Sequence, residues 1–313
     1  MKKINVLLTN VGRKIYFLNF IKKINSDIKI HVSDCDANNA AFAFDKNIKK
    51  YLVSKSTLNP REYLNNIIKI VKNNRINILI PLTDYDLNIF SKNLSLFDKL
   101  NCKAVISSNE VISICLNKRK TEVFAKKFNF YYPKSYYSLK KLRINFPVVK
   151  KRIFGSGSIG YSIIKNNNQL SKFFVEGKDM IQEFINGEEF NIDILNDFNG
   201  NFVSYCAKKK ILMRSGETDK AKIVISKLFE IFSKRLSREL GHIGNLDCDI
   251  ILSNNKIYLL DLNPRFGGGY PFTHLAGLNY INAILKMALN KEFKVFKNPK
   301  ILTGMKAICL TSF

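Results

Sequence analysis

The 313-residue sequence lacks several features that would place it in a common class of protein. No run approaches the roughly 18 to 20 apolar residues of a membrane-spanning helix. The N-terminus MKKINVLLTN has neither the length nor the small-residue cleavage site of a signal peptide. Only three histidines are present, and the six cysteines are scattered without a CxxC pair. We therefore expect a cytoplasmic protein with no membrane partner, no zinc knuckle and reduced, mostly structural cysteines.

Acidic residues are scarce relative to basic ones. The chain has 51 lysines and arginines against 25 aspartates and glutamates, a formal net charge of +26. Such an excess would suit a nucleic acid or an anionic membrane surface. The lysines are spread over the whole chain, however, and nucleic-acid readers usually cluster lysine and arginine on one element. A nucleic-acid partner is therefore not favoured, although the lysines can help to attract an anionic substrate.

Glycine-rich nucleotide fingerprints are also missing. Asp34 and Asp36 follow a predicted strand, as the ribose-binding acid of a dinucleotide-binding fold would. The turn TNVGRK has one glycine, however, where GxGxxG needs three. No GxxxxGK[ST] loop is present. These absences disfavour NAD binding and a P-loop phosphate site.

Strands alternate with helices in the first third of the chain. Apolar runs predict strands at Ile4–Asn10, Ile28–Asp34 and Ile76–Asp84, with helices at Ile15–Ile24 and about Pro60–Asn73. This order predicts a parallel sheet covered by helices, which we extend to residue 108. Ligands of such sheets lie beyond the carboxyl ends of the strands, where the sequence has Asn10, Asp34, Asp36, Thr83, Asp84 and Asp86.

Two segments in the middle of the chain combine strands with polar turns. FPVVKK (Phe146–Lys151) predicts a strand, and small residues in the following loop IFGSGSIG leave backbone N–H groups free to contact phosphate, with Lys151 as countercharge. MIQEFINGEEFNIDIL (Met180–Leu195) predicts a strand, a turn at Asn186 and Gly187, and a second strand from Glu189. Ordinary hairpins with solvated side chains are the alternative for both segments. A helix is predicted from about residue 117 to about residue 132.

The third segment contains opposed acids. GNLDCDIILSNNKIYLLDLNPRF predicts two strands joined by a turn, which places Asp249 opposite Asp261, with Asn263 on the same face as Asp261. Two like charges on an apolar hairpin are destabilising unless something neutralises them. Mg²⁺ does so, because it takes oxygen ligands from a few carboxylates and from substrate phosphates. Acids paired with lysines are the alternative explanation.

These segments, in order from about residue 4 to residue 277, resemble the ATP-grasp superfamily, in particular the carbamoyl-phosphate-synthase-like carboxylate-amine ligases. The resemblance implies a mixed α/β and α+β fold, with ATP between two antiparallel sheets. The implied domains are a parallel α/β pre-ATP-grasp domain (1–108), a lid subdomain with a linker helix (109–185) and a large C-terminal subdomain (186–313).

The resemblance also implies the roles of individual residues. NKRKT supplies an ATP-contacting lysine, and Lys151 lies four residues before the lid glycine, with Arg152 where the family usually has proline and Lys150 as second choice. The implied ATP-binding residues are Lys118, Lys151, Gly155, Ser156, Gly157, Ser158, Glu183, Phe184, Ile185 and Glu189. The implied metal ligands are Asp249, Asp261 (usually glutamate in the family) and Asn263, with Asp247 in reserve. Arg265, Lys210 and Arg214 are implied to act on the phosphates and the acyl group.

The activity implied is an ATP-dependent ligase that joins a carboxylate to an amine through an acyl phosphate, releasing ADP and phosphate. ATP and two Mg²⁺ ions would be required, with Mn²⁺ able to substitute, and small-molecule carboxylates and amines would be the partners. A homodimer is left open. The alternatives are a carboxyphosphate-forming enzyme and a non-catalytic nucleotide-binding protein. The glycines 267–269 would let a substrate approach the backbone, and His274 is either a substrate contact or a helix-start residue.

Overall fold

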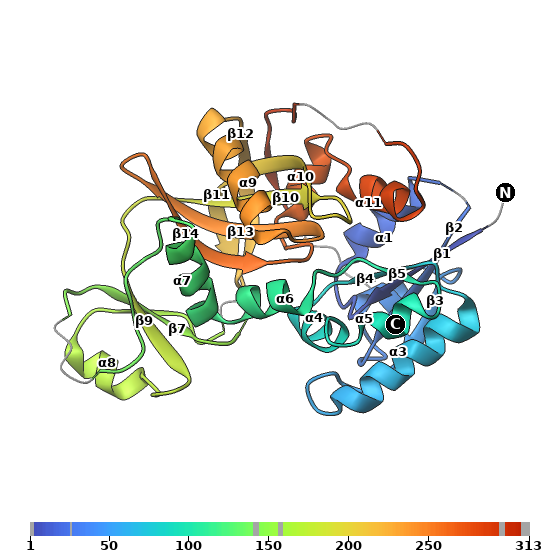
Figure 1. Cartoon of the computed structure of the whole chain (residues 1–313), viewed down its shortest axis with the longest axis horizontal. Helices are drawn as coiled ribbons and strands as arrows, with labels where there is room; N and C mark the ends of the chain where they lie inside the picture. Colours follow the sequence, from blue (N-terminus) through green and yellow to red (C-terminus); the bar gives the residue numbers. More distant parts are fainter. Residues whose placement is uncertain (1–2, 26, 140–143, 156–158, 294–297, 308–313) are drawn as a thin grey trace.

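A computed structural model describes residues 3–25, 27–139, 144–155, 159–293 and 298–307. These residues form a five-stranded, a four-stranded and a six-stranded β-sheet. Figure 1 shows the five-stranded sheet at one end of the molecule, the four-stranded sheet at the other and the six-stranded sheet between them.

The five-stranded sheet is parallel, as predicted, and its strand order is β3-β2-β1-β4-β5. Its strands are β1 (Ile4–Thr9), β2 (Ile28–Asp34), β3 (Lys49–Leu52), β4 (Ile78–Pro81) and β5 (Lys103–Ala104). The accompanying helices are α1 (Ile15–Lys22), α2 (Ala40–Ala43), α3 (Pro60–Asn74), α4 (Asp84–Phe90) and α5 (Leu94–Asp98). The strand predicted to reach Asp84 ends at Pro81, because the Thr83 side chain accepts from the Asp86 N–H and caps α4.

Two helices, α6 (Asn109–Leu116) and α7 (Lys118–Lys127), follow this sheet. The helix predicted to reach residue 132 ends at Lys127 because the chain changes direction at Asn129, whose φ is 52°. Tyr131 then forms a bridge to Tyr258. Buried residues of both helices pack into the apolar cluster of the six-stranded sheet, although we had assigned these helices to the lid segment.

The four-stranded sheet has the order β6-β9-β7-β8 and is antiparallel. Its strands are β6 (Ser135–Tyr136), β7 (Val148–Arg152), β8 (Ser162–Ile164) and β9 (Asp179–Glu183), with α8 (Asn167–Phe173) on one face. Val148, Ile164, Leu170 and Ile181 form its small buried core.

The six-stranded sheet is also antiparallel, with the order β14-β13-β10-β11-β12-β15. Its strands are β10 (Glu188–Asn196), β11 (Phe202–Arg214), β12 (Glu217–Val224), β13 (Gly244–Ser253), β14 (Lys256–Asn263) and β15 (Thr303–Met305). The helices of this region are α9 (Lys227–Leu240), α10 (Tyr270–Leu275) and α11 (Tyr280–Ala288). Because β9 and β10 belong to different sheets, residues 184–187 connect two sheets and do not close a hairpin.

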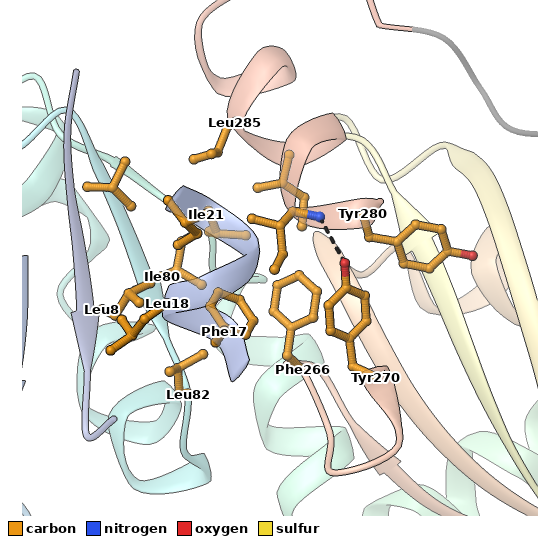
Figure 2. Packing of buried hydrophobic residues seen from close by; sticks show 14 of the residues in the cluster. Leu8, Phe17, Leu18, Ile21, Ile80, Leu82, Phe266, Tyr270, Tyr280 and Leu285 are labelled. Carbon is orange, nitrogen blue, oxygen red and sulfur yellow. Dashed lines mark hydrogen bonds between the residues drawn. The ribbon is translucent and has the colours of Figure 1, made fainter. Parts of the chain in front are cut away.

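One large apolar cluster joins the N-terminal sheet to the C-terminal helices. Helix α1 lies between them, with Phe17 packed edge-on against Phe266 at a centroid distance of 4.8 Å (Figure 2). Phe20 stacks on the ring of His274 at 3.6 Å. His274 lies in the last turn of α10, so the interpretation as a helix-start residue was wrong, and its role as a substrate contact stays a prediction.

Within the part of the chain that the structure describes, no helix is long and apolar enough to cross a membrane.

Candidate functional site

A cavity of about 370 Å³ lies between the four-stranded and the six-stranded sheet. Most of the residues that we predicted to bind ATP or metal line it. From the lid side and its connection come Lys118, Lys151, Gly155, Glu183, Phe184 and Ile185, and from the six-stranded sheet come Glu189, Lys210, Asp249 and Asp261. The predicted Ser156, Gly157 and Ser158 lie outside the described residues.

Lysines from three different elements converge on this cavity. Lys118, at the start of α7, is 3.1 Å from Asp261, and Lys210 on β11 is 2.8 Å from Asp249. Lys151 on β7 is beside these pairs. Burial lowers its pKa to about 8, with the acids raising the value and the other two lysines lowering it. The cavity therefore brings together three lysines, whose ammonium groups can contact phosphate oxygens, and two of them are paired with acids.

The neighbouring Lys150 has a different surrounding. Its ammonium is 3.6 Å from Asp179, which Arg152 also contacts at 2.8 Å, and both Lys150 and Asp179 are buried. This difference follows from the alternation of side chains along a strand. Lys151, and not Lys150, is the lysine that lines the cavity.

Asp249 and Asp261 are cross-strand partners in the β13–β14 hairpin, as predicted from the sequence. Each carboxylate forms an ion pair with a lysine, so the alternative of acids paired with lysines describes the contacts present. Although burial alone would raise it, the Lys210 ammonium holds the pKa of Asp249 below its usual value. Asp249 is thus maintained as a carboxylate, the form that a divalent cation needs as ligand.

The donor set fits Mg²⁺ if phosphates complete the coordination shell. Within the described residues, no three His, Cys, Asp or Glu side chains form a metal-binding group. The hairpin offers two carboxylates and the amide oxygen of Asn263, whose nitrogen donates to the Asp247 carbonyl at 3.3 Å. Mg²⁺ usually takes only one or two protein carboxylates and keeps substrate phosphates and waters as its other ligands.

The connection between the two sheets also lines the cavity. Glu183 is tied to Lys134 by two hydrogen bonds: its side chain accepts from the Lys134 N–H at 2.9 Å, and its own N–H donates to the Lys134 carbonyl at 3.0 Å. Phe184 and Ile185 line the cavity beside apolar residues, including Leu260. An apolar wall of this kind suits a flat heterocycle.

A second cavity of about 240 Å³ adjoins the first and shares Lys210, Asp249 and Asp261 with it. It extends to the N-terminal domain, where Lys14, Thr83, Asp84 and Tyr85 line it. Its remaining described lining residues include Asn191, Glu217, Asp247, Asn263, Arg265, Gly268 and Gly269.

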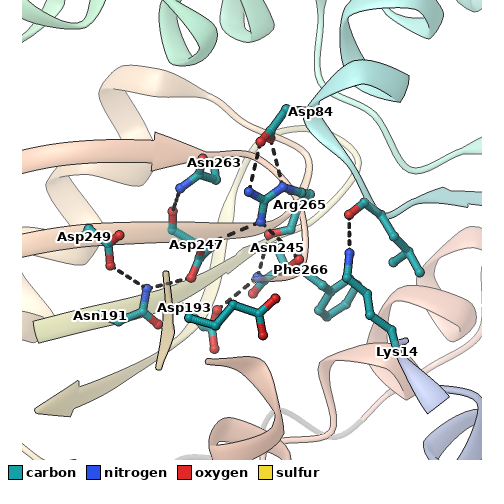
Figure 3. Close-up of polar contacts among 12 residues, drawn as sticks. Lys14, Asp84, Asn191, Asp193, Asn245, Asp247, Asp249, Asn263, Arg265 and Phe266 are labelled. Carbon is teal, nitrogen blue, oxygen red and sulfur yellow. Dashed lines mark hydrogen bonds and ion pairs between the residues drawn. The ribbon is translucent and has the colours of Figure 1, made fainter. Parts of the chain in front are cut away.

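Arg265 crosses between the domains in this second cavity. Its Nε donates to Asp84 Oδ1 at 2.8 Å and its Nη2 to Asp84 Oδ2 at 3.0 Å, a bidentate pair (Figure 3). Its Nη1 is 3.8 Å from Asp247. The N-terminal domain thus fixes the orientation of the guanidinium. The predicted Arg214 is not in this arrangement: it pairs with Asp219 at 3.2 Å and is absent from the described residues that line the two cavities.

The glycine loop after β14 packs on polar side chains of the six-stranded sheet. A Cβ at Gly267 would lie 2.1 Å from the Asp247 Cγ, and one at Gly269 would lie 2.7 Å from Asn191 Oδ1. The space that we expected a substrate to use is therefore partly occupied by the protein's own side chains. Asn191 in turn donates to Asp247 at 2.6 Å and to Asp249 at 3.0 Å.

Asp247 is the acid with the most perturbed protonation among these residues. Burial, followed by the charges of Asp249 and Asp193, raises its pKa to about 7, against the influence of Arg265 and the Asn191 hydrogen bond. Sequence reasoning missed Asn191, although the period of two places it on the same face of β10 as Glu189. No comparable pattern in the sequence indicated that Lys14 and Glu217 would line the second cavity.

Two antiparallel sheets that enclose a cavity with lysines from both, and with a pair of opposed aspartates on one, are the arrangement of a nucleotide-binding clamp. Comparison of the sequence with family models agrees: residues 115–269 match the ATP-grasp domain, and residues 6–122 match the PylC-like N-terminal domain. The chain belongs to the ATP-grasp superfamily, as the resemblance predicted.

Curated relatives are similar over part of their length. A carbamoyl-phosphate synthase of Methanobrevibacter smithii is 25% identical over 170 residues, which are 48% of this chain and 45% of that protein. A carbamoyl phosphate synthase large chain of Campylobacter jejuni is 23% identical over 210 residues, 60% of this chain and 19% of that one. The chain thus spans less than half the length of these relatives.

Solved structures confirm the predicted fold class. A biotin carboxylase of Campylobacter jejuni in complex with β,γ-ATP aligns with a TM-score of 0.73 at 16% identity, over 96% of this chain and 74% of that one. An L-amino acid ligase of Bacillus licheniformis gives a TM-score of 0.70 at 16% identity, over 92% and 75% of the two chains. An N5-carboxyaminoimidazole synthetase of Staphylococcus aureus complexed with ADP gives 0.74 at 13% identity, over 98% and 83%. At these identities the likeness establishes the fold alone.

Proposed function

We propose that this protein is an ATP- and Mg²⁺-dependent ligase that joins a carboxylate to an amine, or a similar nucleophile, through an acyl phosphate. The observation that supports this function most is the convergence of Lys118, Lys151 and Lys210 on the opposed acids Asp249 and Asp261 between two sheets. The names of several structural neighbours, which include an amino acid ligase and an N5-carboxyaminoimidazole synthetase, point to the same class. A cytoplasmic location and small-molecule partners belong to this proposal.

ATP would occupy the larger cavity. Its adenine would lie against Phe184 and Ile185, with the backbone of that connection as hydrogen-bond partner, and Glu189 would accept from the ribose hydroxyls. Lys118 and Lys151 would neutralise the phosphates. Because Lys118 is paired with Asp261 in the structure, entry of the phosphates would exchange its partner from a carboxylate to a phosphate oxygen.

Asp249, Asp261 and Asn263 would hold the metal, with two ions expected and Mn²⁺ able to replace Mg²⁺. The metal would supply electrostatic neutralisation of the β- and γ-phosphates. The exchange of the Lys118 partner would free Asp261 for this role, while Asp249 would keep its contact with Lys210. Asn191 would keep Asp249 in place through the hydrogen bond at 3.0 Å.

The reacting groups would meet where the two cavities join. A carboxylate oxygen of the substrate would attack the γ-phosphorus, and ADP would leave. An amine would then attack the acyl carbon, with phosphate as leaving group. Lys210, which lines both cavities, and Arg265, held by Asp84, would stabilise the negative charge that develops.

Bicarbonate is the second candidate for the carboxylate. The curated relatives named carbamoyl-phosphate synthase and the neighbour named biotin carboxylase favour this alternative. The product of the first step would then be carboxyphosphate. A bicarbonate arm in the assay separates the two functions, because only carboxyphosphate formation would make ADP release depend on added bicarbonate.

A screen for ADP release tests the proposal. Pairs of carboxylates and amines, with and without bicarbonate, are incubated with the protein, ATP and Mg²⁺. Lys151→Ala is expected to weaken ATP binding by about 2 kcal/mol, roughly 30-fold, because a charge-assisted bond is lost. Lys150→Ala is the matched control, since its side chain is directed away from the cavity. Asp261→Ala should raise the Mg²⁺ requirement.

The proposal fails if no pair stimulates ADP release and nucleotide binding survives Asp261→Ala unchanged at every Mg²⁺ concentration. Nucleotide binding that depends on Lys151, without any turnover, would instead indicate the non-catalytic alternative.

A further inference from the structure

We propose that Lys14 is a specificity-determining residue that binds an anionic group, a carboxylate or a phosphate, of the substrate in the second cavity. This group is additional to the one that reacts with ATP. The inference rests on the proposed function in one respect: it assumes that the substrate of the ligase binds in the second cavity.

Lys14 is placed by the fold at the junction of the two domains. It immediately precedes α1, and its ammonium donates to the main-chain carbonyl of Leu82, just beyond the end of β4. Lys14 and Leu82 both line the second cavity. Figure 3 shows Lys14 and Asp249 on opposite sides of Asp247 and Arg265, so the lysine is removed from the acids that face the nucleotide.

Of the acids near Lys14, Asp84 and Glu217 are bonded to other cations, and Asp86 accepts from neutral hydroxyl and amide donors. Both carboxylate oxygens of Asp84 accept from Arg265. Glu217 pairs with Arg13 at 3.3 Å and with Lys306 at 3.0 Å. Lys14 thus lines the cavity together with the paired Arg265, and its own hydrogen bond goes to a neutral carbonyl.

The protonation of Lys14 is consistent with a site for an anion. Burial, and next the positive charge of Arg265, lowers its pKa to about 8, while Glu217, Asp84 and Asp86 act in the opposite direction. These are the charged groups that face it from α4, β12 and the end of β14. An anion placed between Lys14 and Arg265 would offset the repulsion between the two cations. Its binding would therefore favour the charged form of the lysine.

The two ends of the second cavity then define the class of substrate. At one end, Lys210, Asp249 and Asp261 adjoin the nucleotide cavity, so the reacting group must lie there. At the other end is Lys14. A small molecule with a reacting group and a separate carboxylate or phosphate satisfies both ends. A molecule with a neutral amide in place of the second anion would leave the lysine without a charged partner.

Lys14 could alternatively serve only to join α1 to β4 through the Leu82 carbonyl. Three variants separate this structural role from anion binding. Lys14→Met removes the charge and the donor, Lys14→Gln keeps an N–H donor without charge, and Lys14→Arg keeps the charge. Lys23→Met is the matched control, because Lys23 is an exposed lysine at the other end of α1.

The first test measures protection of Lys14 from an amine-reactive reagent in the full chain, followed by mass spectrometry. The probes are succinate, glutarate and inorganic phosphate, with succinamide and glutaramide as neutral counterparts. We expect at least one anion to slow the labelling of Lys14 by about tenfold, the effect of roughly 1.4 kcal/mol of binding, and to leave Lys23 unchanged. Protection should be lost above pH about 8, as the free lysine loses its proton. Comparison of phosphate with the dicarboxylates identifies which anion the site prefers.

The second test measures the affinity of the protecting anion and of its neutral counterpart by calorimetry. Preference for the anion should disappear in Lys14→Met and Lys14→Gln and return in Lys14→Arg. Equal labelling with and without every anion, or a preference that survives in Lys14→Gln, would overturn the inference. Neither test requires turnover, so failure of the ligase proposal, seen as absent ADP release, is distinguishable from failure here.

Discussion

Substitution of Gly267 by alanine should lower both stability and turnover, because the new Cβ would collide with Asp247. The glycine does not have a positive φ, so alanine can adopt its backbone conformation, but the new Cβ would lie 2.1 Å from Asp247 Cγ. Ordinary van der Waals contact begins near 3.4 Å, so one group must move by more than 1 Å. Asp247 cannot retreat freely, because it is buried and accepts from Asn191 at 2.6 Å.

The expected cost follows from these contacts. Overpacking of this kind typically costs about 1 to 3 kcal/mol of folding free energy. A displacement near 1 Å in the groups that hold Asp249 should also reduce turnover by about 100-fold. Urea denaturation measures the first effect, and ADP release with the productive substrate pair measures the second.

Gly268→Ala is the matched control. Its Cβ would lie 2.9 Å from the Glu217 carboxyl group, but that side chain is 37% exposed and can turn aside. The expected cost is therefore below about 1 kcal/mol. If Gly267→Ala is as stable and as active as the Gly268→Ala variant, the glycine does not serve to accommodate Asp247, and the reasoning is refuted.

Further variants test the surrounding contacts. Asp84→Asn should destabilise the protein by about 3 kcal/mol, because it removes the bidentate charged partner of the largely buried Arg265 and leaves it Asp247, at 3.8 Å, as ion-pair partner. It should also lower kcat with little change in KM for ATP. Unchanged stability in a denaturant titration would contradict this. Burial lowers the pKa of Lys151 to about 8, so its side chain is a charged ammonium below that pH. The affinity for ATP should therefore fall as pH rises through about 8 in the wild type. It should not fall in Lys151→Arg. Calorimetry across that range checks this, and a flat wild-type profile would count against it. Lys150→Met should reduce the free energy of unfolding by about 1 to 3 kcal/mol, because it removes a cation from buried Asp179, and it should not weaken ATP binding. Lys151→Met should weaken ATP binding and leave stability nearly unchanged. Equal nucleotide affinities of the two variants would disprove the assignment of the two lysines to opposite faces of β7.

The β13–β14 hairpin could be predicted because the residues that determine it are neighbours in the sequence. Period-two alternation and the turn at Asn254 and Asn255, both with positive φ, fix the register that places Asp249 opposite Asp261. The parallel N-terminal sheet was predictable for a similar reason, since strand and helix periods alternate along the chain. The resemblance to a family then supplied candidate roles for individual residues, which the periodicity of apolar residues could not have supplied.

Features that depend on contacts between distant segments could not be predicted in this way. The end of α7 is one example: Tyr131 leaves the helical pattern because its carbonyl accepts from the Leu259 N–H at 2.8 Å. The Arg265–Asp84 pair joins residues far apart in sequence, so neither residue's local pattern indicates the other. Arg214 was likewise assigned to the site from its motif alone, and nothing in the sequence indicated its ion pair with Asp219.

The distribution of apolar cores has a mechanical consequence. A single buried cluster extends from the N-terminal sheet through α1 to α10 and α11, whereas the four-stranded sheet has a separate core of few residues. Displacement of the four-stranded sheet would therefore expose little apolar surface, while separation of the N-terminal domain would expose much. Lys151 is on the four-stranded sheet, whose displacement exposes little apolar surface. Asp249 and Asp261 are on the six-stranded sheet. Lys151 can thus change its distance from these acids without any loss of folding in the rest of the molecule.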